Sequence, residues 1–87
     1  MAKRDRLLVQ VLSGTADASV PFDGLRGLLR RFGFDERIRG SHHIFTKSGV
    51  DEILNLQPKG RNAKPYQVKQ VRAVIVKYRL AGETNGQ

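Results

Sequence analysis

The only two histidines of this chain, His42 and His43, stand next to each other directly after Gly40 and Ser41. Two apolar residues follow, so the pair lies at the start of a predicted strand rather than in an irregular tail. Histidine is the side chain whose unperturbed pKa of about 6.5 allows proton transfer near neutral pH. In a basic chain, this places a proton-transfer group on a surface that attracts polyanions. The first reaction to consider is a metal-free attack on RNA.

Such a reaction needs a base for the 2′-hydroxyl proton, an acid for the 5′-oxygen leaving group and cations for the charged phosphorane. Neighbouring strand residues point to opposite faces, so His42 and His43 cannot both reach one phosphate. If Phe45 faces the helices, His43 does too, and His42 shares the open face with Ile44 and Thr46. This assigns His42 as the catalyst. The alternative is a pair of structural histidines.

Candidate RNA-binding side chains come from strand ends, loops and the start of the last helix. Lys64 and that helix N-terminus are expected to hold a phosphate together. Tyr66 either stacks on a base or lies buried beside Val71. The candidates are Ser41, Arg39, Lys47, Lys59, Arg61, Lys64 and Lys69. The alternative is that the basic residues are only solvated surface charge and that the serine only forms a turn.

No metal site or cofactor is expected. The two histidines diverge on one strand, and no carboxylates stand near them at ligand spacing. Asp51 and Glu52 fall on a turn and are expected to be solvated.

Composition limits the classes of protein to consider. The chain has 87 residues, a net charge of +8 and no cysteine, which together fit one small domain in a reducing compartment. The charge favours phosphates or an acidic protein as partners, and a membrane surface less so, because no single helix carries the basic residues. No apolar run approaches the roughly 18 residues of a membrane span, and no signal peptide is visible. We expect a soluble, cytoplasmic protein.

Apolar spacing predicts the helices and strands that must position these residues. A first helix over 3–13 ends at Gly14, and a connection over 15–19 leads to a second helix that begins with Pro21 and ends at Gly33. The predicted strands cover 36–39, 42–46 and 52–57, and a basic loop without periodicity covers 59–62. The last helix begins at Lys64 and Pro65, and residues 81–87 form a frayed tail.

The last helix has a predicted core stripe of Val68, Val71, Ile75 and Tyr78. Its other polar residues are left for solvent or a ligand; they are Gln67, Lys69, Gln70, Arg72 and Lys77. This order of elements predicts an α+β two-layer sandwich, in which helices pack on one face of a three-stranded antiparallel sheet and leave the other face partly open. The whole chain, 1–87, is one domain with an extra N-terminal helix and connection over 1–19 and a core over 20–80.

Three stretches resemble the HicA family of mRNA interferase toxins, whose fold is related to the double-stranded RNA-binding domain. They are Leu28–Phe34, Gly40–Phe45 and Ala63–Val68, and the resemblance runs from Val20 to about Leu80. It implies a metal-independent endoribonuclease that cleaves mRNA and is inhibited by a HicB-type antitoxin.

The family's catalytic histidine maps onto His42 when it is counted from Gly40-Ser41, although some members keep a histidine at the place of His43. Many relatives have His-Pro after the third strand, where this chain has Gln57-Pro58. A second histidine is therefore missing there. The first helix lies outside the family's usual domain, so the resemblance gives it no role.

Two functions without RNA cleavage remain open. One is a non-catalytic RNA-binding module on the same scaffold. The other is a DNA-binding regulator that places its last helix in a major groove, which is disfavoured because no helix-turn-helix pairing is evident.

Overall fold

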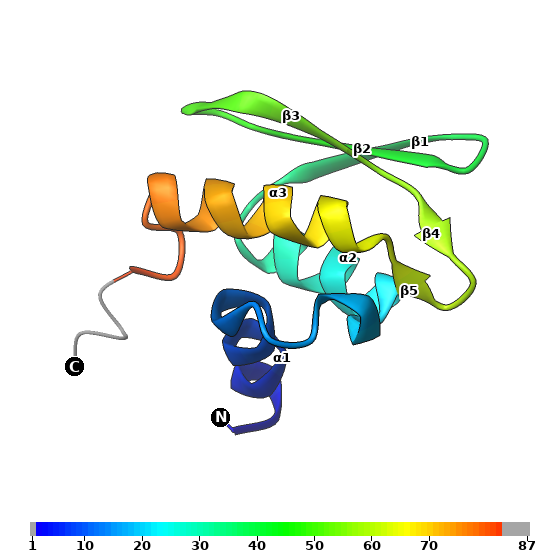
Figure 1. Ribbon diagram of the computed structural model, residues 1–87. Coiled ribbons are helices and arrows are strands. Elements are labelled where there is room, and N and C mark those ends of the chain that lie inside the picture. Colours follow the sequence, from blue (N-terminus) through cyan, green and yellow to red (C-terminus); the bar gives the residue numbers. More distant parts are fainter. Residues whose placement is uncertain (1, 83–87) are drawn as a thin grey trace.

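The structure is a computed structural model that describes the backbone of residues 2–82 and the side chains of residues 6–82. Its elements follow the predicted order (Figure 1): α1 (Ala2–Ser13), the 3-10 turn η1 (Asp17–Ser19), α2 (Phe22–Arg31), β1 (Asp35–Arg39), β2 (His42–Lys47), β3 (Val50–Leu56), β4 (Pro58–Lys59), β5 (Asn62–Ala63) and α3 (Pro65–Lys77). The three predicted helices and the three predicted strands are thus confirmed. The expectation that Asp51 and Glu52 fall on a turn is wrong, because β3 begins at Val50 and includes both. Residues 83–87 of the predicted frayed tail lie outside the described part of the chain, and Ala81, its first residue, packs against the core instead of fraying.

The sheet has the order β1-β2-β3, and both pairings are antiparallel. In Figure 1, α2 and α3 lie against one face of this sheet, and α1 lies on their far side. Within residues 2–82 no helix lies on the other face, so the predicted α+β sandwich with one open sheet face is confirmed. The open and the covered face of β2 therefore present its two histidines to different surroundings.

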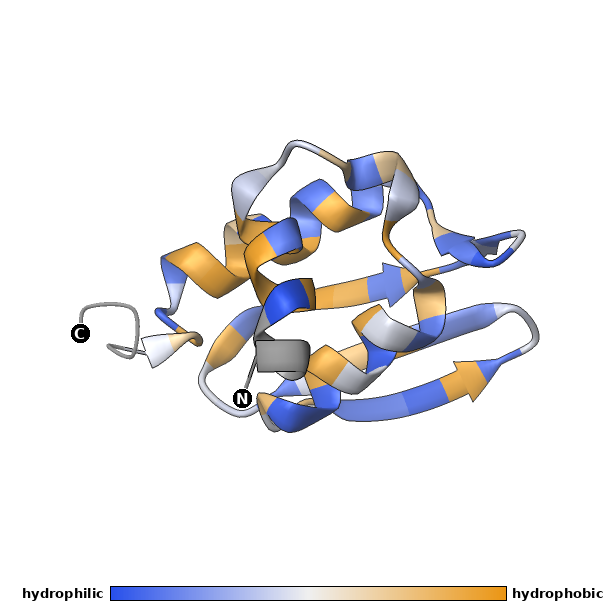
Figure 2. Ribbon diagram, turned by 90° about the horizontal axis from the view of Figure 1, so that it is seen from below, coloured by the Kyte–Doolittle hydropathy of each residue, from blue (hydrophilic) through white to orange (hydrophobic). Residues whose placement is uncertain are grey.

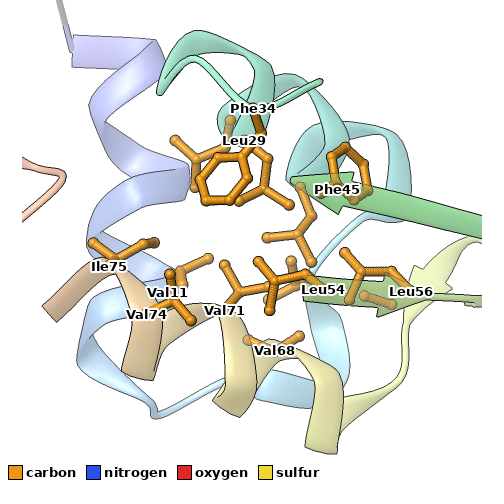
Figure 3. Close-up of a cluster of buried hydrophobic side chains, with 14 of the residues drawn as sticks. Val11, Leu29, Phe34, Phe45, Leu54, Leu56, Val68, Val71, Val74 and Ile75 are labelled. Carbon is orange, nitrogen blue, oxygen red and sulfur yellow. The ribbon is translucent and has the colours of Figure 1, made fainter. Parts of the chain in front are cut away.

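The hydrophobic core lies between the sheet and the helices, and Figure 3 shows its side chains converging from both layers. It contains Val11, Val20, Phe22, Leu25, Leu28, Leu29, Phe34, Phe45, Leu54, Leu56, Ala63, Val68, Val71, Val74 and Ile75. Hydrophobic and hydrophilic residues alternate around α2 and α3 in Figure 2, as expected for helices with one buried face. Each fully buried large apolar side chain stabilises the fold by about 1.5–3 kcal/mol.

The N-terminal helix is part of this core. Val11 of α1 is fully buried, and Arg72 of α3 donates hydrogen bonds to the Val11 carbonyl and to both carboxylate oxygens of Asp17. The hydrogen bond from Arg72 lowers the pKa of Asp17 below its ordinary value. The expectation that Arg72 is left for solvent or ligand is therefore wrong, because it fastens α1 and η1 to α3.

The basic loop predicted over 59–62 folds into a short hairpin, β4–β5, with Gly60 and Arg61 at its turn. Gly60 has φ +64°, a conformation that other residues adopt only with strain. The backbone N–H of Phe22 donates to the Arg61 carbonyl at 2.9 Å, so the hairpin lies against the start of α2. Strands of two residues are too short to leave a periodic pattern in the sequence.

Across residues 2–82, no helix has the length and apolar character that crossing a bilayer would require.

Candidate nucleic-acid site at the start of strand β2

The two histidines lie on opposite faces of the sheet, as predicted. Phe45 is fully buried among the helices, and His43, two residues before it, faces the same way. The ring of His43 meets that of Phe22 edge-on, with 4.9 Å between the centroids. His42 is exposed and pairs with Arg39 across the strands, so both occupy the open face.

The side-chain amides of Asn55, in β3, and Gln57, just after β3, hold the ring of His42. Its Nδ1 lies 3.0 Å from Oδ1 of Asn55, and its Nε2 lies 3.4 Å from Nε2 of Gln57. An amide oxygen only accepts hydrogen bonds, so Nδ1 of His42 carries the proton that is donated to Asn55. In the neutral ring, Nε2 then keeps its lone pair and is the basic nitrogen.

Gln57 connects His42 to two of the predicted RNA-binding residues. Its Nε2 donates to Oγ of Ser41 at 3.1 Å, and its Oε1 accepts a hydrogen bond from Nζ of Lys64 at 3.1 Å. The side chain of Gln57 therefore lies between the ammonium of Lys64 and the imidazole of His42 and contacts both. Gln57 thus joins the cluster as a neutral hydrogen-bonding group.

A buried glutamine fixes the position of this cluster. Gln67 of α3 is 3% exposed; its Oε1 accepts from the Gln57 backbone N–H at 2.9 Å, and its Nε2 donates to the Asn55 carbonyl at 3.1 Å. The expectation that Gln67 faces solvent or a ligand is therefore wrong. A signal was present in the sequence, because Gln67, Val71 and Val74 share one helical face at spacings of four and three residues.

His43 belongs to a different, ionic cluster. Its Nδ1 lies 2.7 Å from Oε2 of Glu36, whose side chain is only 8% exposed. Arg26 forms two hydrogen bonds with the same carboxylate, at 2.6 and 3.3 Å, and Arg30 lies 3.4 Å from it. Burial alone would raise the pKa of Glu36, but the hydrogen bonds from Arg26 and His43 outweigh it and lower that pKa. The sequence did not predict a role for Glu36, because the alternating charges of this strand do not show which carboxylate is buried in the fold.

The remaining predicted RNA-binding residues do not gather at His42. Lys47 lies at the other end of β2, and its Nζ lies against Gly33: a Cβ added to this glycine would be 2.9 Å from that Nζ. Lys69 lies close enough to Asp17 to contribute, after the hydrogen bond from Arg72, to the low pKa of that carboxyl. Lys59 is exposed on β4. The site around His42 therefore contains Ser41, Arg39 and Lys64 from the predicted set.

Two further expectations have a clear outcome. Tyr66 is 57% exposed, so burial beside Val71 is wrong and its ring face is accessible. Glu52 is not simply solvated: Lys77 and Tyr78 hydrogen-bond its carboxylate at 2.8 and 2.7 Å and lower its pKa to about 2.

Among the described side chains, no three carboxylates and histidines lie close enough together to hold a metal ion.

Comparisons with family models, with curated proteins and with solved structures find no match to this chain. The resemblance to the HicA family therefore stays a prediction from the sequence.

Proposed function

We propose that this protein is a metal-independent endoribonuclease toxin that cleaves single-stranded mRNA with His42 as its general base. One observation carries the proposal: an exposed imidazole has its Nδ1 hydrogen-bonded to Asn55 and its basic Nε2 beside the Gln57–Lys64 pair. An open position is needed because a backbone ribose must approach Nε2 directly. The net charge of +8 supports a polyanionic substrate.

In the proposed reaction, Nε2 of His42 accepts the proton of a 2′-hydroxyl. The 2′-oxygen forms a bond to phosphorus, the bond to the 5′-oxygen breaks, and that oxygen takes a proton from the imidazolium or from water. The products are a 2′,3′-cyclic phosphate and a 5′-hydroxyl. Lys64 and Arg39 stabilise the negative charge of the phosphorane. A single general base is worth about 10²–10⁴-fold in rate, so we expect a slow nuclease.

The chemistry of the substrate tests this proposal. Purified protein should cleave a labelled single-stranded RNA in the presence of a chelator and leave a cyclic phosphate end. It should not cleave the same oligonucleotide when every 2′-hydroxyl is replaced by hydrogen, and a His42→Ala preparation should be at least about 100-fold slower. Cleavage of the deoxy oligonucleotide, or equal rates for wild type and His42→Ala, would contradict it.

We propose a HicB-type antitoxin as the protein partner and the cytoplasm as the location, on the resemblance to HicA toxins. The net charge of +8 supports an acidic partner, and Ile53, 66% exposed on the open face, offers that partner an apolar contact. Expression of this chain should stop growth, and co-expression of an adjacent reading frame should restore it. The His42→Ala variant should not stop growth on its own.

A non-catalytic RNA-binding module is the second candidate. The exposed ring of Tyr66, two residues after Lys64, favours it, because base stacking contributes to binding without chemistry. RNA binding that persists in a protein with no cleavage activity would favour this second function.

A further inference from the structure

A groove lies on the helix-facing side of the sheet, between the start of α2 and the β4–β5 hairpin. It has a volume of about 600 Å³, and its lining includes Asp23, Arg26, His43, Pro58 and Arg61. The hydrogen bond from the Phe22 N–H to the Arg61 carbonyl and that from the Ala63 N–H to the Val20 carbonyl, both 2.9 Å, hold the hairpin in place. We call this feature the His43 groove.

One nitrogen of His43 is available in this groove. Nδ1 is engaged by Glu36, whose lowered pKa keeps it an ionised acceptor, so Nδ1 carries a proton. Every buried side-chain nitrogen and oxygen in the described residues has a hydrogen-bond partner, and Nε2 of His43 has none, so Nε2 reaches solvent. A protonated ring would present Nε2–H as a donor to an anion.

The charges around the groove leave a positive excess. Asp23 and Glu36 are both paired with Arg26, and Glu36 is also close to Arg30. These bonds use three of the five N–H groups of Arg26 and leave two free. Arg61, on the hairpin turn, is exposed and has no ion partner within 4 Å among the described residues. Arg61, Arg26 and His43 all line this one groove, and an anion is the ligand that its two arginines fit.

The groove adjoins the site of the proposed reaction. Pro58, in its lining, directly follows Gln57, which contacts His42 and Lys64. His43 itself directly follows His42. Because the two places lie on opposite faces of the sheet, a chain of phosphates would have to pass over the start of β2 to occupy both.

We infer that the His43 groove is a phosphate subsite, which binds a backbone phosphodiester of single-stranded RNA next to the one at His42. The choice of RNA rests on the proposed function; the anion site itself rests on the groove. Arg61 supplies a positive charge that no described carboxylate neutralises, and Arg26 supplies its remaining N–H groups.

The test measures the affinity of the whole chain for a 2′-O-methyl RNA, which binds but has no 2′-hydroxyl to react. Arg61→Ala should raise Kd about three- to tenfold and reduce the slope of log affinity against log salt by about 0.7. Arg31→Ala is the matched control, because Arg31 is exposed on α2, outside the groove, and has no ion pair among the described residues. Equal effects of the two variants would overturn the subsite.

Nitrogen NMR of the histidine rings provides the second measurement. Titration with the 2′-O-methyl RNA should move the Nε2 signal of His43 in wild type, and Arg61→Ala should weaken that movement. A movement with inorganic phosphate alone, without one from RNA, would mean a site for free phosphate and would overturn the RNA subsite. If these binding effects appear while unmodified RNA is not cleaved, the subsite is supported and the proposed nuclease is wrong. If RNA is cleaved in a His42-dependent way but these binding effects are absent, the nuclease is supported and the subsite is wrong.

Discussion

The two histidines stand next to each other in the chain, but their surroundings differ in almost every respect. His42 is exposed on the open sheet face and is held by the neutral amides of Asn55 and Gln57. His43 has 13% of its side chain exposed and is held by the carboxylate of Glu36, which Arg26 also binds. The alternation of the strand sets which face each ring occupies, because it directs one ring to solvent and the next towards the helices.

The comparison separates two tasks. A ring held by neutral amides in the open presents a basic nitrogen that only a 3.4 Å hydrogen bond from Gln57 occupies. It adds little to stability, because water can replace its partners. A ring held by a covered carboxylate ties β2 to β1 and α2, and its loss leaves a buried charge with fewer partners. Activity and stability should therefore respond to different histidines.

The largest expected effect is on cleavage. His42→Ala should lower the RNA cleavage rate by about 10²–10⁴-fold and change the free energy of unfolding by less than about 0.5 kcal/mol. His43→Ala should instead cost about 1–3 kcal/mol of stability, because it removes a hydrogen bond from buried Glu36. Cleavage assays on folded protein and urea titrations measure both quantities for each variant. If His43→Ala abolishes cleavage in folded protein while His42→Ala does not, the assignment of the catalyst is reversed.

The next effect concerns the carboxylate of the His43 cluster. Glu36→Gln removes the charge that Arg26 and His43 share, and we expect a loss of about 3 kcal/mol in the free energy of unfolding. Asp35→Asn is the control, because Asp35 is the exposed neighbour on the same strand. Urea titration at pH 7 measures both. A loss no larger than that of Asp35→Asn would mean that the ionic cluster contributes nothing beyond a surface pair.

The contrast between the two faces could be predicted from the sequence, and the clusters could not. Side chains alternate between the two faces along residues 42–45. Once Phe45 is assigned to the core, His43 must face the core and His42 the open side. Glu36, Asn55 and Gln67 acquire their roles from contacts between segments 7 to 13 residues apart, which depend on register and on the angle of α3 over the sheet. The β4–β5 hairpin escaped prediction for the same reason, since its support comes from α2 rather than from its own residues.

A smaller effect tests how the His42 cluster is held. Gln67→Leu should leave the Gln57 N–H and the Asn55 carbonyl without their partner and cost about 1–3 kcal/mol. Since both residues position His42, cleavage by the folded variant should also fall. Gln70→Leu, on the exposed side of the same helix, is the control. Unchanged cleavage in folded Gln67→Leu would show that His42 is positioned without this support.

The smallest effect uses Glu52 as an exposed counterpart of Glu36. Hydrogen bonds from Lys77 and then Tyr78 lower the pKa of Glu52 from 4.5 to about 2. A lowered pKa in the folded state adds stability that is complete above the unfolded value and is lost as the pH falls from about 4.5 towards 2. The urea midpoints of wild type and Glu52→Gln should therefore differ slightly at pH 7 and converge near pH 2.

Asp51→Asn, a change at the exposed neighbour, should follow the wild type through this range. Added salt should reduce the difference at pH 7, because Lys77 and Glu52 have 58% and 36% of their side chains exposed and their attraction is screened. A difference that stays constant from pH 7 to pH 2 would assign the effect to the packing of Tyr78 instead of to the charge. The difference made by Glu36→Gln should resist salt, because that carboxylate is covered, and this separates a buried ionic cluster from an exposed ion pair in the same molecule.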